Sequence, residues 1–164
     1  ALLLCNPTNK KIIQKNYKKM CSNLKFLTSI LVDADNPNYC DVGGILYTRS
    51  MNVLHTYPAA RLDSTFVIPE SVHTVGPYAF TNNENLTTLI VDSKLNVLSH
   101  LALIKMPALT GLYFCDGAPL IWDDHAVERC EALTLYFPEA EEPIIDGMWT
   151  APNGSVFQAK YFSK

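Results

Sequence analysis

The sequence predicts an α/β repeat fold: a short right-handed leucine-rich-repeat solenoid with parallel strands on one face, an inserted β-hairpin and an N-terminal helical cap. The first observation is a repeat of 23 residues, which runs over residues 65–87 and again over 88–110. The second is a further copy over 111–134 that is one residue longer. A fixed period of about 20 to 29 residues with recurring leucine-class positions is typical of leucine-rich solenoids.

The three copies share apolar columns, which we expect to form the core. The extra residue of the third copy is placed before the shared alanine, so the columns can be aligned by position. The expected core columns are Phe66, Leu89 and Leu112; Ile68, Val91 and Phe114; Val75, Leu98 and Ile121; Ala79, Ala102 and Ala126; Phe80, Leu103 and Val127; and Leu86, Leu109 and Leu133.

Residues 1–26 are expected to form an N-terminal cap. Apolar residues recur at spacings of three and four over residues 8–27, which predicts an amphipathic helix. The apolar face of this helix consists of Ile13, Tyr17, Met20, Leu24 and Leu27. The lysines beside it are either a solvated helix face, which we favour, or a patch for acidic surfaces or lipids. A polar cap of this kind would cover the core at the end of a solenoid.

The coils are expected to extend over residues 27–138. The sequence of residues 27–33 matches that of residues 86–92 position by position. We therefore expect an earlier coil to begin at Leu27. Residues 139–164 are expected to form a C-terminal cap. Trp149 and Phe157 are the aromatic side chains expected to cover the last coil.

The repeat is interrupted over about residues 34–64. Two short apolar runs, 44–47 and 53–57, flank a polar turn over 48–52. This pattern predicts a β-hairpin carried on the solenoid as an insertion.

Alternation along each strand assigns one column to the outer face of the solenoid. Phe66 and Ile68 belong to core columns, so Val67 between them should point outward. The outward column supplies the candidate ligand-binding residues Leu31, Val67, Ile90, Tyr113 and Tyr136. The alternative is an ordinary sheet surface, or one covered by the inserted hairpin, and the sequence favours neither reading.

Length and composition indicate a single domain over residues 1–164. The net charge of −3 is too small to imply a nucleic-acid partner. The apolar runs are only a few residues long, whereas a membrane-spanning helix needs about 20, so no integral membrane segment is expected. Residues 2–5 faintly resemble the end of a lipoprotein signal, but Leu4 is not small. We therefore expect a short strand there and no signal in this chain.

No catalytic residue, metal site or cofactor is expected. The common nucleotide-binding, hydrolase and metalloprotease motifs are absent from the sequence. Five cysteines are an odd number and show no CxxC spacing, which argues against a zinc or disulfide framework. One suggestive cluster is Asp123, Asp124 and His125, followed by Glu128. We interpret it as an exposed polar turn rather than a weak metal site or an acid/base pair.

One repeat resembles a known family in its motif. The phrase Ile68-Pro69-x-x-Val72-x-x-Val75-Gly76-x-x-Ala79-Phe80, completed by Leu86, is similar to the leucine-rich repeat of BspA-type surface proteins. The inserted segment is similar too, with Asn36-Pro37-Asn38-Tyr39, Gly44-Ile45-Leu46-Tyr47 and Tyr57-Pro58-Ala59 in the order that this family shows. The resemblance covers about residues 27–138. The second and third copies depart from the motif, with Val91-Asp92 and Phe114-Cys115 in place of Ile-Pro.

The resemblance implies a non-enzymatic cell-surface or secreted protein used for adhesion or protein binding. Its partner would be a protein or a host surface component, and the family brings no catalytic residues. Two alternatives remain: a structural spacer or display segment of a longer repeat array, and an intracellular interaction scaffold.

Overall fold

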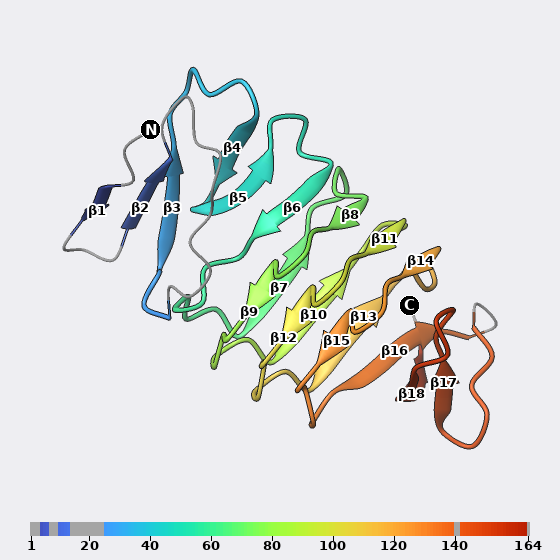
Figure 1. Ribbon diagram of the computed structural model, residues 1–164. Helices are drawn as coiled ribbons and strands as arrows, with labels where there is room; N and C mark the ends of the chain where they lie inside the picture. Colours follow the sequence, from blue (N-terminus) through green and yellow to red (C-terminus); the bar gives the residue numbers. More distant parts are fainter. Residues whose placement is uncertain (1–3, 7–9, 14–24, 140–141, 164) are drawn as a thin grey trace.

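The computed structural model describes residues 4–6, 10–13, 25–139 and 142–163 and is a β-solenoid of about five turns (Figure 1). Parallel strands of successive coils lie side by side along its length, as the repeat predicted. The strands are β1 (Leu4–Asn6), β2 (Lys10–Ile13), β3 (Ser29–Val32), β4 (Tyr39–Val42), β5 (Ile45–Thr48), β6 (Val53–Thr56), β7 (Thr65–Ile68), β8 (Thr74–Val75), β9 (Phe80–Thr81), β10 (Thr88–Val91), β11 (Val97–Leu98), β12 (Leu103–Ile104), β13 (Gly111–Phe114), β14 (Ile121–Trp122), β15 (Val127–Glu128), β16 (Thr134–Pro138), β17 (Met148–Thr150) and β18 (Val156–Phe162). None of the described residues belongs to a helix long enough to cross a membrane.

Each regular coil contributes short strands to three parallel ladders. The first ladder stacks β7, β10, β13, β16 and β18, and antiparallel β17 closes it. The second ladder stacks β6, β8, β11 and β14, and the third stacks β9, β12 and β15. The register advances by one repeat per coil, so Thr65 pairs with Thr88 and Thr88 with Gly111. Equivalent positions of the repeat are therefore neighbours in space.

The apolar columns fill the space between the ladders. Ile68, Leu86 and Phe114 are among the fully buried side chains, and 28 buried residues of the coils, the inserted hairpin and the C-terminal hairpin form one core cluster. Burying a side chain of this size contributes about 1.5–3 kcal/mol. Alternation along the first ladder is as predicted, since Ile68 is 1% exposed and Val67 is 48% exposed. The repeat therefore specifies both the core and the outer face.

Two corners of each of the three regular coils use the left-handed backbone conformation. The first corner falls on Tyr78, Leu101 and His125, with φ of 57, 52 and 56°, and the second on Asn82, Lys105 and Arg129, each with φ of 55°. Residues with a Cβ atom rarely adopt positive φ, and asparagine tolerates it best among them. The second corner leads the chain from the third ladder back towards the first.

The prediction of an N-terminal helix is wrong for the part of that segment that the structure describes. Lys10–Ile13 forms β2, which pairs antiparallel with β1 and parallel with β3. Residues 14–24, which carry most of the expected helix, lie outside the described residues. Ile12 and Ile13 are β-branched and favour an extended backbone, and β3 supplies partners that a short helix would lack. The described residues contain no helix, so the coils form an all-β solenoid rather than an α/β repeat.

The segment that starts at Leu27 does not continue the first ladder. Its strand β3 pairs with β2, whereas β7 is the terminal strand of the first ladder. Leu27 and Ile30 pack with Leu46 of β5 in a separate small core, and the Ile30 N–H donates to the Gly44 carbonyl at 2.8 Å. The β4–β5–β6 segment has therefore taken the position next to β3.

The predicted hairpin is confirmed, and it is part of the solenoid rather than an attachment to it. β5 and β6 pair antiparallel, and β4 adds a third strand on the outer side of β5. β6 pairs parallel with β8, with Val53 opposite Thr74 and Leu54 opposite Val75. The hairpin thus provides the first strand of the second ladder.

One core column differs from the prediction at its third member. Leu98 pairs with Trp122 and not with Ile121, so the extra residue of the third copy lies before Ile121. Ile121 is 52% exposed, and Trp122 is 3% exposed and packs on Phe114. Both residues are apolar, so hydrophobicity alone does not reveal which one points inward.

The C-terminal hairpin covers the last coil with aromatic side chains. The Trp149 ring lies 5.1 Å from Phe137 and 5.2 Å from Trp122, and Phe157 lies 5.2 Å from Trp122, measured between ring centroids. Glu142 anchors the hairpin, because its carboxylate accepts from the Trp149 indole N–H and from the Ala118 N–H, each at 3.0 Å.

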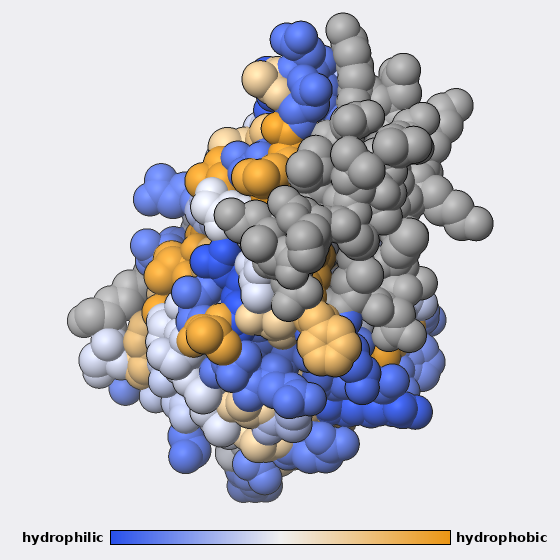
Figure 2. Space-filling view, turned by 90° about the vertical axis from the view of Figure 1, so that its left-hand side faces the viewer, coloured by the Kyte–Doolittle hydropathy of each residue, from blue (hydrophilic) through white to orange (hydrophobic). Residues whose placement is uncertain are grey.

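Figure 2 shows the side of the molecule at the opposite end of the solenoid, where hydrophobic residues are scattered among hydrophilic ones. Exposed apolar side chains in this region of the chain include Phe26, Leu31, Val42 and Leu62. Arg61 and Asp63, which flank Leu62 in the sequence, form an ion pair with 2.6 Å between Nε and Oδ2.

Candidate functional site: the strand face and the corner groove

The outward column of the first ladder is continuous over four coils. Val67 pairs with Ile90, Ile90 with Tyr113, and Tyr113 with Tyr136. We call these four residues the strand face. Val67 is 48% exposed and the other three are half-buried, so the hairpin over residues 39–56 does not cover the column. The surface grades from aliphatic to aromatic along the solenoid.

Leu31, the fifth candidate, is placed elsewhere. It is 43% exposed but lies on β3 and pairs with Ile12, outside the six-stranded sheet that carries the strand face. Residues 27–33 resemble the start of a repeat, yet a short motif does not determine which strand lies next to it. The structure therefore brings together four of the five sequence-predicted residues.

The two tyrosines of the strand face form a stacked pair. Their ring centroids are 4.3 Å apart and the ring planes differ by 6°. Gly111 makes room for them, because a Cβ atom at that position would lie 2.9 Å from Cε2 of Tyr113 and 3.6 Å from Cε2 of Tyr136. Partial burial and the neighbouring phenol raise the pKa of Tyr113 above its usual value. The Tyr113 phenol is therefore neutral at physiological pH.

An acidic hollow adjoins the aromatic pair. Phe162 of β18 packs edge-on against Tyr113, with 5.6 Å between ring centroids and 75° between planes. The same phenylalanine lines a hollow of about 550 Å³ together with Asp92, Cys115 and Asp116. Carboxylates beside aromatic rings form a surface that accepts an ammonium or guanidinium group.

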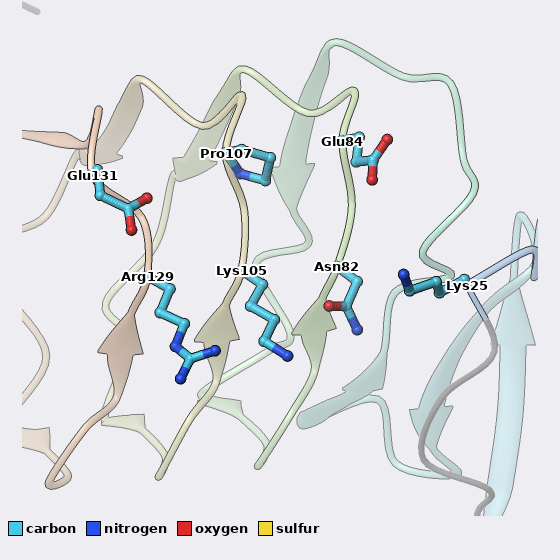
Figure 3. Close-up of a pocket in the computed structure, with 7 residues that line it drawn as sticks. All are labelled: Lys25, Asn82, Glu84, Lys105, Pro107, Arg129 and Glu131. Carbon is cyan, nitrogen blue, oxygen red and sulfur yellow. The ribbon is translucent and has the colours of Figure 1, made fainter.

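A second concave site lies at the second corner of the coils (Figure 3). We call it the corner groove; it is lined by Lys25, Asn82, Glu84, Lys105, Pro107, Arg129 and Glu131 and has a volume of about 320 Å³. Asn82, Lys105 and Arg129 occupy one repeat column, and Glu84, Pro107 and Glu131 occupy another two residues later. Aligning the copies over these polar columns would have revealed the groove, whereas the search for catalytic motifs did not.

The acidic turn formed by Asp123, Asp124 and His125 lies beside His100 of the preceding coil. Nδ1 of His125 is 3.9 Å from the Glu128 carboxylate, and its ring centroid is 6.0 Å from that of His100. Nδ1 of His100 is hydrogen-bonded to the Asp124 carbonyl at 2.7 Å, and the His100 N–H donates to Asp123. Among the described residues, no three His, Cys, Asp or Glu side chains are arranged to hold a metal ion. These contacts link two coils.

Two cysteine thiols, those of Cys40 and Cys130, are partly buried and form no disulfide. Burial raises the pKa of the Cys130 thiol, which keeps it in the unreactive protonated form.

The fold is similar to that of solved leucine-rich-repeat proteins. A leucine-rich repeat protein from Eubacterium ventriosum superposes with a TM-score of 0.64 and 25% identity over 80% of this chain and 37% of that one. A leucine-rich cell surface protein from Faecalibacterium prausnitzii superposes with a TM-score of 0.52 and 20% identity, over 85% of this chain and 43% of that one. The chain thus spans less than half the length of either. No protein-family model and no curated protein sequence matches the chain.

These similarities show the leucine-rich-repeat fold and confirm the resemblance to BspA-type leucine-rich-repeat proteins. The chain therefore has the leucine-rich-repeat fold, built as a β-solenoid.

Proposed function

We propose that this chain is a non-catalytic protein-binding or adhesion module of a cell-surface or secreted protein, and that the partner docks on the strand face. The observation that carries the proposal is the stacked pair of Tyr113 and Tyr136, which is held half-exposed on a rigid sheet. Tyrosine brings a large contact area with few rotatable bonds, so little conformational entropy is lost on binding.

The acidic hollow indicates the charge of the partner. Asp92 and Asp116 lie beside Phe162, which contacts Tyr113, so the aromatic pair continues directly into a region of negative charge. A protein partner that places a lysine or arginine in the hollow would gain contact with both the carboxylates and the rings. Solenoids commonly bind partners along their extended strand faces. The Faecalibacterium prausnitzii protein is described as a cell surface protein, which supports placement of this chain at a cell surface.

The test measures binding to host extracellular proteins and to epithelial cells, for the wild type and for Tyr113→Ala combined with Tyr136→Ala. We expect the double variant to bind a basic partner about ten-fold more weakly while it remains folded, which a cooperative melting transition verifies. Tyr78→Ala is the matched control, since Tyr78 is 51% exposed at a corner of the coil away from the first ladder. Equal affinity of the wild type and the double variant would eliminate the strand face as the docking surface.

A second proposal is that the chain is a spacer within a longer repeat array. It is supported by the two solved neighbours, which are more than twice as long as the matched part. Sequencing of the complete transcript tests it: further copies of 23 residues contiguous with this chain support the spacer, and a non-repeat flank on both sides contradicts it.

A further inference from the structure

We propose that the corner groove binds a linear acidic polysaccharide, and that it does so independently of the strand face. The proposal rests on a row of nitrogen-bearing side chains and on the loss of folding stability that results from placing two cations in that row. It also rests on the chemistry of the opposite wall of the groove.

The row follows from the stacking of the coils. The Asn82 N–H donates to the Ile104 carbonyl and the Lys105 N–H to the Glu128 carbonyl, each at 3.1 Å, so the second corners of three coils lie directly beside one another. Successive coils of such a solenoid are about 4.8 Å apart. In Figure 3 the side chains of Asn82, Lys105 and Arg129 extend in the same direction, and Lys25 lies at the end of the row. The groove therefore offers regularly spaced donors to an extended ligand.

Keeping two cations in this row is unfavourable for the fold. Lys105 and Arg129 both have φ of 55°, a conformation that asparagine tolerates far better, and Asn82 occupies the equivalent position. Like charges in neighbouring strands also repel. Among the described residues, no carboxylate forms an ion pair with Lys105 or Arg129. Neighbouring cations that no carboxylate neutralises create a positive potential that attracts an anionic ligand.

The opposite wall selects the class of ligand. Glu84 and Glu131 lie across from the cationic row, and Pro107 lies between them in the column. Carboxylates accept hydrogen bonds from hydroxyl groups, and the proline ring gives a flat apolar surface. An acidic polysaccharide carries anionic groups and hydroxyl donors on every unit, and one sugar ring is close in length to one coil. An acidic peptide supplies the anions but lacks the hydroxyl row, so the mixed groove favours the polysaccharide.

The experiment compares binding of the wild type and of Lys105→Asn combined with Arg129→Asn to immobilised heparin, polygalacturonate and polyglutamate at low ionic strength. We expect the wild type to bind at least one of the two polysaccharides and the double variant to bind it roughly ten-fold more weakly. Asparagine suits the backbone of the corner, so the variant should remain folded, which its melting temperature verifies. Lys94→Asn combined with Lys160→Asn is the charge-matched control, because both lysines are exposed and lie outside the groove.

A second variant separates the polysaccharide from a purely electrostatic site. In Glu84→Gln combined with Glu131→Gln the groove becomes more positive, so any simple anion should bind more tightly. If the carboxylates accept sugar hydroxyls, polysaccharide binding instead weakens while polyglutamate binding strengthens. Tighter binding of both ligands would overturn the proposal in favour of an acidic protein segment.

Two further outcomes also overturn the proposal: no binding of the wild type to either polysaccharide, and equal binding by the wild type and the Lys105/Arg129 variant. The strand-face variant, Tyr113→Ala with Tyr136→Ala, should retain full polysaccharide binding. Loss of polysaccharide binding in that variant would show that the strand face and the corner groove act as one site. Because each proposal has its own variant and its own ligand, the failure of one can be told apart from the failure of the other.

Discussion

The phenol of Tyr57 donates a hydrogen bond of 2.8 Å to the Asp63 carboxylate, which also accepts from Nε of Arg61 at 2.6 Å. The Tyr57 ring is buried between Phe66 and Phe80, at centroid distances of 5.0 and 5.1 Å. Burial and the hydrogen bond to Asp63 raise the pKa of Tyr57 above its usual value. The segment between the hairpin and the first regular coil is thereby fixed to the core.

This contact predicts a pH-dependent loss of stability. The hydrogen bond from Arg61 lowers the pKa of Asp63, so the stabilisation is fully present above the unfolded-state pKa of about 3.9 and is lost as the pH falls through the lower folded-state pKa. Asp63→Asn should cost about 1 kcal/mol at neutral pH, because the 41% exposed side chain is screened by solvent. Urea unfolding of both proteins between pH 7 and pH 3 measures this, and a difference that stays constant below pH 4 would contradict it.

The buried side-chain amide of Asn83 should contribute more to the stability of the fold than Asp63 does. Its side chain is fully buried, and Oδ1 accepts from the backbone N–H groups of Asn85 and Leu86 at 2.9 and 2.7 Å. Asn83→Ala leaves the buried Leu86 N–H without a partner, which should cost about 2–3 kcal/mol. Asn85→Ala serves as the control, since it removes one part-buried bond to the Arg61 carbonyl and should cost about 1 kcal/mol. Denaturant midpoints of the two variants in the reverse order would show that the buried acceptor is not the dominant contribution.

The repeat was predictable because its physics is local. Alternation and a fixed period placed Ile68 inward and Val67 outward, and register then aligned Val67 with Ile90 and both tyrosines. The predicted hairpin followed from two apolar runs and a turn. These features need no knowledge of distant contacts.

The features that the sequence did not predict depend on pairing between distant segments. Residues 27–33 have the pattern of a repeat strand, but β2 and β5 became the neighbours of β3 and moved Leu31 away from the strand face. The extra residue of the third copy could not be located, because Ile121 and Trp122 are both apolar. The corner groove was missed because Lys105 and Arg129 are 24 residues apart and lack a motif, although the repeat makes them neighbours.

Gly111 predicts a test of the aromatic pair that removes no aromatic ring. In Gly111→Ala the new methyl would meet the Tyr113 ring at 2.9 Å, so the ring must shift from its stacked position. We expect a loss of about 1 kcal/mol in stability, a changed near-ultraviolet circular dichroism signal from tyrosine, and weaker binding at the strand face. Thr88→Ala is the register-matched control, since Thr88 pairs with Gly111 on the adjacent strand. An unchanged spectrum in Gly111→Ala would mean that the stack does not depend on the missing Cβ.

Replacing Lys105 by asparagine should stabilise the solenoid. Its φ of 55° is unfavourable for lysine, and asparagine, present at the equivalent position 82, reduces that cost. Replacement also removes the repulsion with Arg129 on the next coil. Lys105→Asn should therefore raise the free energy of unfolding by about 0.5–1 kcal/mol, and the gain should shrink at high salt, where the charge repulsion is already screened. Lys94→Asn changes the net charge equally and should leave stability nearly unchanged. Thermal unfolding at low and at high salt measures both effects, and a destabilised Lys105→Asn would show that the lysine is kept for the fold rather than for a ligand.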